Sequence, residues 1–364
     1  MKILFIPYGT DQAPATRYRV TQYLPHLEAR NVEYSVFSSI SKFSTSLMIK
    51  SPDFAPLTRL IYYAYVFIER LFRFFYILAI SRKFDILFLQ RTTFPFKLEL
   101  LLKLANRNII FDIDDAIYLP DKEGKDIITR IKQYVKKTEV ISILRISRAI
   151  IVENEYIKNF VSQYCNYVYK IPGPIDTERF FVKKREDSKK GVTLGWIGSP
   201  ATTSYLHMLD SAFRDIKKRY DFVKFKFIGL GKYENREIKF ENAEWNYDTE
   251  VSQLQSFDIG IMPMPDNEWT RGKLGCKMLQ YMAVGVPAVV PYSSTNAEII
   301  KNGENGFFAT KESEWTEILS ILIKNEELRR AIGQKGRDTV LEKCSLSRNI
   351  SKLIDIFSNI MSLA

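Results

Sequence analysis

Cysteine is nearly absent from this chain of 364 residues, which contains only Cys165, Cys276 and Cys344. The three lie far apart, and there is no Cys-x-x-Cys and no cluster of cysteine with histidine. This scarcity argues against a disulfide framework and against structural zinc, and it fits a protein of the reducing cytoplasm. The apolar part of residues 1–10 is too short for a signal peptide, so we predict that it forms a first strand.

Histidine is also scarce, because His26 and His207 are the only two. Neither lies beside a serine or cysteine nucleophile motif. Hydrolysis by a catalytic triad and general-base catalysis by histidine are therefore poor explanations of this sequence.

An uninterrupted apolar run that would span a membrane is missing too. Residues 57–80 are strongly apolar and aromatic, but Glu69, Arg70 and Arg73 interrupt them, and a span needs roughly 20 apolar residues. In a helix, Arg59, Arg70 and Arg73 fall within about 60° of arc. Two interpretations stay open: a helix at a membrane surface with an arginine edge, and a helix on the sheet whose arginines reach water. The net charge of +11 favours the membrane surface.

This positive charge implies an anionic partner, which nucleic acid, a phospholipid surface or a phosphorylated small molecule would each provide. The lysines are spread over the chain and no nucleic-acid-binding motif is present, so we expect no nucleic acid. The length exceeds what one hydrophobic core usually supports, so two domains are expected.

Strand and helix signals alternate in both halves of the sequence. The predicted strands are residues 3–6, 32–37, 85–89, 109–111, 149–152 and 168–171, then 192–197, 223–228, 259–262 and 288–290. Helices of the second half are predicted near residues 203–218, 250–256, 276–284 and 296–301. Apolar strands that alternate with helices are typical of parallel sheets covered on both faces.

We therefore predict two doubly wound α/β domains, residues 1–173 and 174–345, with a charged linker near residues 172–190. Residues 346–364 are predicted to form a final helix that packs back toward the first domain. Such sheets bind ligands at the carboxyl ends of their strands, so a cleft between the domains is the expected site.

The most informative segment covers residues 269–291, where Arg271, Lys273 and Lys277 approach a short predicted helix through a glycine-rich loop. A loop with little side-chain bulk, a helix N-terminus and nearby cations are suited to a phosphate. Lys277 and Gln280 share one helix face with Tyr281 and Val284, which we expect to hold a ligand. The alternative is a helix with a solvated polar edge.

Two further clusters of the second half follow strands. Gly198, Ser199 and Thr202 lie in a turn that suits a diphosphate, although an ordinary strand–loop–helix turn would look similar. Asn296 and Glu298 are predicted to open a helix, where Glu298 would face the helix dipole or, near a nucleotide, accept sugar or ribose hydroxyls.

Two clusters of the first half also follow strands. Arg17 and Arg19 offer contacts to phosphate or carboxylate, with Thr16 as a helix cap, or they are ordinary surface arginines. Asp114 and Asp115 belong to an acidic group that would bind a metal, cap a helix, act as a base or bind sugar hydroxyls. A metal ranks low because no second acidic cluster supplies the remaining ligands.

The order of these motifs resembles family 4 glycosyltransferases, which are retaining enzymes of the GT-B fold with two Rossmann-like domains facing a cleft. The resemblance covers nearly the whole chain and is strongest over residues 193–200 and 257–307. The N-terminal motifs ATRYR and FDIDDAIY resemble one branch of the family.

The chain departs from the family at a Glu-x7-Glu pair, because Gly272 and Gln280 stand at its two positions. Gln280 can still bond ribose hydroxyls, whereas Gly272 cannot replace a carboxylate. Ser199 and Thr202 stand where the family often has a basic residue, so the phosphate charge would fall on the cations of residues 271–277.

The resemblance implies a nucleotide-diphosphate sugar as donor, bound mainly by the second domain, with no cofactor and no metal. Its phosphates would lie against residues 198–203 and the cations Arg271, Lys273 and Lys277, and Lys277 would stabilise the leaving diphosphate. Gln280 would bind ribose, and Asn296 with Glu298 would bind ribose or the sugar.

In the first domain, the resemblance implies that Arg17 and Arg19 face a phosphate of the acceptor or donor, and that Asp114 or Asp115 orients hydroxyls. A glycan or lipid-linked acceptor, used in bacterial surface polysaccharide synthesis at the inner face of the cell membrane, would explain the basic surface. The alternatives are a nucleotide-sugar 2-epimerase of the same fold, a nucleic-acid-binding protein and a non-catalytic partner subunit.

Overall fold

The computed structural model describes residues 1–50, 54–120, 127–183 and 191–362. The chain divides into two compact units, Met1–Pro174 with Leu346–Ala364, and Ile175–Ser345. The C-terminal helix α15 (Leu346–Ser362) therefore belongs to the first unit. Residues 184–190 of the predicted linker lie outside the described residues.

The first unit contains a six-stranded parallel sheet of order β2-β1-β3-β4-β5-β6. Its strands are β1 (Lys2–Pro7), β2 (Glu33–Val36), β3 (Ile86–Gln90), β4 (Ile109–Ile113), β5 (Ala149–Val152) and β6 (Val168–Lys170). All six strands predicted for this half are present, and their ends differ from the prediction by at most two residues. The helical segments are α1 (Pro14–Arg19), η1 (Thr21–Tyr23), α2 (Leu24–Glu28), α3 (Lys42–Lys50), α4 (Pro56–Ile80), η3 (Ser81–Lys83), η4 (Pro95–Lys97), α5 (Glu99–Ala105), α6 (Ile127–Ile146) and α7 (Glu155–Val161).

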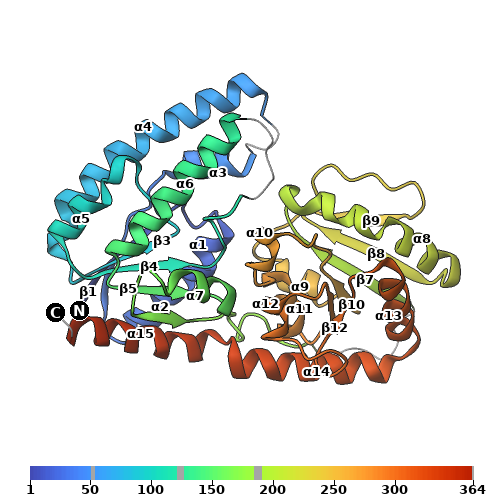
Figure 1. The fold of residues 1–364 in the computed structure, drawn as a ribbon. Helices are drawn as coiled ribbons and strands as arrows, with labels where there is room; N and C mark the ends of the chain where they lie inside the picture. Colours follow the sequence, from blue (N-terminus) through green and yellow to red (C-terminus); the bar gives the residue numbers. More distant parts are fainter. Residues whose placement is uncertain (51–53, 121–126, 184–190, 363–364) are drawn as a thin grey trace. The chain divides into compact units, whose positions relative to one another are not determined.

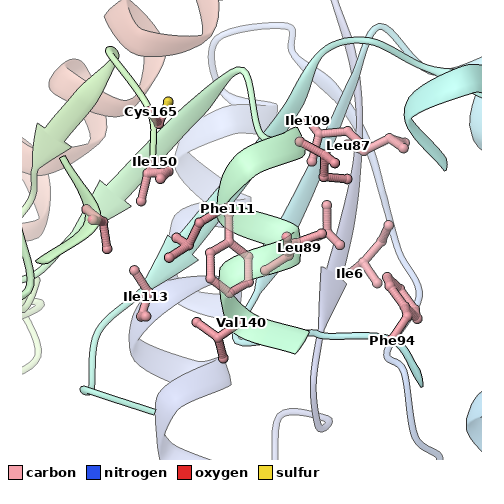
Figure 2. Packing of buried hydrophobic residues seen from close by; sticks show 14 of the residues in the cluster. Ile6, Leu87, Leu89, Phe94, Ile109, Phe111, Ile113, Val140, Ile150 and Cys165 are labelled. Carbon is pink, nitrogen blue, oxygen red and sulfur yellow. The ribbon is translucent and has the colours of Figure 1, made fainter. Parts of the chain in front are cut away.

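Alternate residues of these strands enter two different cores, because successive side chains of a strand point to opposite faces. On one face, Leu87 and Phe111 pack with Val140 of α6 (Figure 2). Phe74 of α4 belongs to the same core. Helix α15 runs along the other face of the sheet (Figure 1). There, Phe357 of α15 packs against Phe88 of β3. Helices thus cover both faces of the sheet. Polar side chains gather instead at the carboxyl ends of its strands.

The second unit contains another six-stranded parallel sheet, of order β12-β11-β10-β7-β8-β9. Its strands are β7 (Val192–Ile197), β8 (Val223–Ile228), β9 (Phe240–Ala243), β10 (Ile259–Ile261), β11 (Ala288–Val290) and β12 (Phe307–Phe308). The sequence did not predict β9 and β12, which are the two edge strands. Edge strands bury fewer side chains, and FENA and FF show no apolar alternation long enough to detect.

In the second unit, helices are present near residues 203–218, 250–256 and 276–284, as predicted, although the first of these regions contains two helical segments and the helix at residues 268–271 was not predicted. The helical segments of this unit are η5 (Pro200–Leu209), α8 (Asp210–Arg219), α9 (Glu250–Leu254), α10 (Glu268–Arg271), α11 (Cys276–Ala283), α12 (Ser294–Ala297), α13 (Glu312–Lys324) and α14 (Glu326–Lys343). The helix predicted at residues 296–301 is wrong, because α12 begins at Ser294 and ends at Ala297. Ser293 caps it by accepting a hydrogen bond from the backbone N–H of Asn296 at 3.0 Å.

The three arginines of α4 are partly exposed, so both interpretations of residues 57–80 stay open, but each arginine also donates a hydrogen bond within the protein. Arg59 donates to the carbonyl of Phe54 at 3.1 Å, Arg70 donates to the carbonyl of Thr93, and Arg73 donates to that of Ser38 at 3.0 Å. The arginines thus tie the helix to the protein. Across the described ranges, we find no helix that combines the length and the apolarity needed to cross a membrane.

Candidate active site

The turn after β7 leaves no room for a side chain at Gly198. A Cβ atom added there would lie 2.1 Å from the indole ring of the fully buried Trp196. The next residues form a polar turn, in which the N–H of Ser199 donates to Thr202 Oγ1 at 3.4 Å. Glycine therefore allows the backbone to pass over the indole ring and exposes a turn of small hydroxyl residues.

Lys277, in the first turn of α11, reaches this turn. Its Nζ donates to Thr202 Oγ1 at 3.0 Å and lies 4.4 Å from the ring centroid of Trp196. Burial, aided by the positive charge of Lys273, lowers the pKa of Lys277 to about 7. A cation that water solvates poorly gains most from an anion beside it, so this position is suited to a phosphate group.

Gln280 is buried, with 5% of its surface exposed, and its amide donates to Glu250 Oε1 at 3.0 Å. Glu250 also accepts hydrogen bonds from Trp245 Nε1 at 3.0 Å and from Arg179 at 2.9 Å. This chain lacks both acids of the family's Glu-x7-Glu pair. The carboxylate of Glu250 lies instead beside Gln280, which stands at the second position of that pair. The sequence did not reveal Glu250, because an acid in the first turn of a helix is common and its partners are distant in sequence.

Two of the four residues predicted to form the ligand face of α11 pack inside the protein instead. Tyr281 and Val284 are buried, and the hydroxyl of Tyr281 accepts from the N–H of Ile197 at 3.1 Å and donates to the carbonyl of Ile261 at 3.1 Å. Tyr281 therefore holds α11 against the sheet, and its assignment to a ligand face is wrong. Lys277 keeps a partly exposed side chain.

The loop cations are divided between two places. Arg271 forms a bidentate ion pair with Asp266, with N–O distances of 2.7 and 2.9 Å. Both residues line a cavity of about 170 Å³ beside Tyr292 and Ser293, near the ends of β10 and β11. Lys273 instead acts on Lys277 through its charge. The structure thus associates Lys273 with the Lys277 site and Arg271 with a neighbouring cavity.

Asn296 and Glu298 lie at the other end of α12 from the one predicted. Asn296 is fully buried and donates to the carbonyl of Pro291 at 3.0 Å, while its Oδ1 finds no hydrogen-bond partner in the described part of the chain. Glu298 is half-buried at the C-cap of α12. Its predicted position at a helix N-terminus is therefore wrong, and the dipole there disfavours rather than favours its charge.

In the first unit, Arg19 is enclosed rather than exposed. Only 2% of its surface and 1% of that of Asp112 is exposed, and Arg19 Nε donates to Asp112 Oδ2 at 3.0 Å. Arg17 donates to the carbonyls of Asp11 and Gln12 at 3.1 and 3.0 Å. Thr16 donates to the carbonyl of Gly9 at 3.1 Å from within α1, so it does not cap the helix.

Asp114 and Asp115 are both buried and share Arg91 as a partner. Arg91 pairs with Asp114 through its Nε and with Asp115 at 2.6 Å. Neither Arg91 nor Glu153 was predicted from the sequence. Burial and the charge of Asp114 raise the pKa of Glu153 well above its usual range. Arg91 follows β3, the two aspartates follow β4 and Glu153 follows β5, so each stands just beyond a strand at the same edge of the sheet.

Metal ligation finds no support in these clusters. Among the described residues, no three His, Cys, Asp or Glu side chains are grouped so that they would hold a metal ion. The pairing of Asp114 and Asp115 with Arg91 gives their charges a partner within the protein. Independence from metal and from a cofactor stays a prediction.

Comparison with known proteins bears on the second unit most directly. Residues 176–339 match the family model described as glycosyl transferases group 1. Over 95 residues the chain is also 34% identical to "Putative glycosyltransferase EpsD" of Bacillus subtilis (strain 168). That match covers 26% of this chain and 25% of the relative, so the chain spans about a quarter of the length of this curated protein.

Solved structures share the fold over the whole chain. HepE of Anabaena, in complex with UDP-glucose, has a TM-score of 0.70 and 13% identity, covering 99% of this chain and 100% of its own. A glycosyltransferase of Rickettsia africae has a TM-score of 0.71 and 14% identity over 100% and 99% of the two chains. Sucrose-phosphate synthase of Thermosynechococcus elongatus reaches 0.72 at 10% identity, with both chains fully covered. The predicted GT-B class of fold is confirmed; at these identities the likeness concerns the fold alone.

The group 1 stretch contains every residue that the sequence assigned to the donor. Within it, the structure brings Thr202 of the Gly198 turn together with Lys277, and it places Gln280 beside Glu250. The residues assigned to the acceptor, Arg17 and Arg19, lie in the first unit, outside the matched stretch.

Proposed function

We propose that this protein transfers a sugar from a nucleotide-diphosphate sugar to a glycan or lipid-linked acceptor. The supporting observation is the hydrogen bond from Lys277 to Thr202, which joins a poorly solvated cation to the turn at Gly198. HepE, which shares the fold, was crystallised with UDP and with UDP-glucose, and this supports a nucleotide sugar as the donor.

The diphosphate of the donor lies against the turn, where Lys277 meets it, with Lys273 adding positive charge. In the reaction, the bond between the sugar's anomeric carbon and the diphosphate breaks, and a bond to an acceptor hydroxyl oxygen forms. The proton of that hydroxyl passes to an oxygen of the leaving diphosphate. Lys277 stabilises the negative charge that develops on the leaving diphosphate, a role that substitutes for a metal ion. We propose that the configuration at the anomeric carbon is retained.

The nucleoside occupies the region of Gln280 and Glu250. A ribose has two hydroxyls that can donate to a carboxylate. Glu250 provides such a carboxylate, and it is buried in a place that excludes most water. Asn296 offers an unpartnered oxygen, and Arg271 lies at the neighbouring cavity. Ribose or sugar hydroxyls are suitable ligands for these groups.

The acceptor is assigned to the first unit, where Asp114 and Asp115 orient hydroxyls and Arg17 meets a phosphate. Arg19 is left out of this assignment, because its guanidinium is enclosed with Asp112. An acceptor carried on a lipid diphosphate fits the basic surface, and with it a peripheral contact of residues 57–80 with the inner face of the cell membrane. Synthesis of a bacterial surface polysaccharide is the corresponding role.

Thermal-shift measurements with UDP-, GDP-, ADP- and dTDP-sugars test the donor assignment. A ligand that binds only the folded protein raises its melting temperature, so one nucleotide series should give a shift that grows with concentration. The same screen on a Lys277→Ala variant should show a much smaller shift. A Lys218→Ala variant, which changes an exposed lysine of α8, should show the same shift as the unaltered protein. No shift with any nucleotide sugar would contradict the proposal.

Product analysis separates transfer from epimerisation by an enzyme of the same fold. With donor alone, an epimerase would convert the sugar of the donor, whereas a transferase leaves it intact or hydrolyses it slowly. Conversion of the donor sugar in the absence of acceptor would favour the epimerase.

A further inference from the structure

The exposed surface of α4 is apolar, although helices on protein surfaces normally turn their polar residues outward. Its charged side chains are used within the protein instead. Glu69 accepts a hydrogen bond from the N–H of Ser41 at 2.9 Å and pairs with Arg73 at 3.1 Å. As described above, the three arginines of α4 donate to backbone carbonyls. The polar groups of α4 thus anchor it, and its outward side has almost none.

Large apolar side chains cover this outward side and continue onto neighbouring elements. The most exposed are Phe72 at 75%, Phe96 at 79% and Leu104 at 80%. The apolar face, as we call it, consists of exposed side chains of α3, α4, η4, α5 and α6: Phe43, Ile49, Leu57, Leu60, Ile61, Tyr63, Tyr65, Phe67, Ile68, Phe72, Phe75, Tyr76, Phe96, Leu100, Leu101, Leu104, Ile131, Tyr134 and Val135.

Contacts between rings connect α3, α4 and η4. Phe67 of α4 meets Phe96 of η4 edge-on, with ring centroids 6.0 Å apart, and Phe43 of α3 meets Tyr65 at 6.2 Å. Figure 1 shows α4, α5 and α6 along the same side of the first unit. Apolar patches of more than a few hundred Å² are uncommon on monomeric proteins and mark places of interaction.

The exposed charges on the same five elements are all positive. Among their described side chains, the exposed ones that carry charge are Lys42, Lys97, Lys103, Arg130, Lys137 and Arg145. The acids turn inward: Glu69 is held as above, Glu99 is buried and accepts from Ser142, and Glu139 accepts from Thr93 at 2.7 Å. The surface therefore combines exposed hydrocarbon and aromatic rings with cations alone.

We propose that the apolar face docks on an anionic lipid bilayer, with α4 lying in the plane of the membrane interface. This inference deepens the peripheral contact proposed above for residues 57–80, and it rests on that contact. Apolar and aromatic side chains enter the boundary between headgroups and acyl chains, while basic residues attract anionic headgroups. A second copy of the chain fits less well, because two such faces would bring positive rims together.

Vesicle flotation tests this inference on the full chain. We expect binding to vesicles that contain about 30% anionic phosphatidylglycerol, weak binding to neutral phosphatidylcholine, and partial loss of binding at high salt. The variant Phe72→Glu with Leu104→Glu should bind about tenfold or more weakly, because it puts charge into the apolar face. The matched control, Phe222→Glu with Leu341→Glu, alters exposed apolar residues of the second unit and should bind as the unaltered protein does.

Two measurements keep the outcomes distinct. A tryptophan placed by Phe72→Trp should be quenched by brominated lipids, and all four native tryptophans lie outside residues 1–174. The thermal shift caused by nucleotide sugar should be the same in the two double variants and in the unaltered protein. A failure of the donor assignment can therefore be distinguished from a failure of membrane docking. Absence of binding to anionic vesicles, or equal binding by both double variants, would overturn the inference. So would a dimer, detected by light scattering, that the Phe72→Glu and Leu104→Glu changes dissociate.

Discussion

Lys277 places its ammonium nitrogen 4.4 Å from the ring centroid of Trp196, and the same indole ring is what excludes a side chain from Gly198. One aromatic residue at the end of β7 thus serves two features of the candidate donor site. It holds a cation through the negative face of its ring, and it keeps the adjoining turn free of side-chain bulk. The first three predictions depend on this arrangement.

Replacing Lys277 with Met should lower the rate of sugar transfer about 100- to 1,000-fold, the usual effect of removing one group that stabilises developing charge. The methionine keeps much of the apolar stem, so circular dichroism should show a folded protein. Steady-state kinetics with the donor found by thermal shift gives the measurement, with Lys218→Met as the control. Full turnover by folded Lys277→Met protein would refute the catalytic assignment.

Donor binding should take up a proton at pH 8. With a pKa of about 7, Lys277 is mostly neutral at pH 8 in the free protein, and a bound diphosphate favours its charged form. The uptake should approach about one proton at pH 8 and nearly vanish at pH 6, and affinity should fall as the pH rises above 7. Calorimetry in buffers of different ionisation enthalpy measures it. The diphosphate of a nucleotide sugar is a diester with no group that titrates near neutrality, so Lys277→Met should abolish the uptake.

The substitution Gly198→Ala should destabilise the second unit and weaken donor binding. Its Cβ would lie 2.1 Å from the indole of Trp196, so the ring or the turn must move, at a cost of about 1–3 kcal/mol. Urea unfolding and thermal shift with the donor give the two effects. Ser199→Ala, one residue along the same turn, should change stability much less, and equal losses in the two variants would argue against the steric explanation.

Arg19 and Asp112 should behave as a buried pair. Removing either partner alone, as in Arg19→Met or Asp112→Leu, leaves an uncompensated charge inside the first unit and should cost about 3–5 kcal/mol. The double variant removes both charges and should be closer in stability to the unaltered protein than either single variant. Urea unfolding of the four proteins forms a double-mutant cycle. Additive losses would show that the two residues do not act as a pair.

The sequence predicted the strands far better than the partners of its polar residues. Apolar residues in short runs or in alternation are a local signal, so residues 192–197, 223–228 and 288–290 were identified to the residue. Edge strands β9 and β12 carry little of that signal and were missed. The hydrogen bond between Gln280 and Glu250 joins residues 30 positions apart, and no local pattern reports it.

The orientation of α4 about its own axis could not be predicted from the sequence either. Periodicity places Arg59, Arg70 and Arg73 on one side of α4, but it does not say whether that side meets water or protein. The decision depends on carbonyl groups of three other segments, at Phe54, Thr93 and Ser38. The carbonyls of Thr93 and Ser38 belong to parts of the chain that are distant from their arginines in sequence and meet them only in the folded protein. Only the folded structure therefore shows which face of α4 is turned outward.

The sequence by itself determined the alternation of strands and helices, and it put the Gly198 turn at the end of a strand and Lys277 at the start of a helix, because both depend on local residue order. Tertiary structure decided which of those residues meet. It enclosed Arg19 with Asp112, shared Arg91 between Asp114 and Asp115, and gave the charged residues of α4 partners within the protein. The physical reason is that burial makes each charge find a partner, and the partner available is set by the packing of elements far apart in the chain.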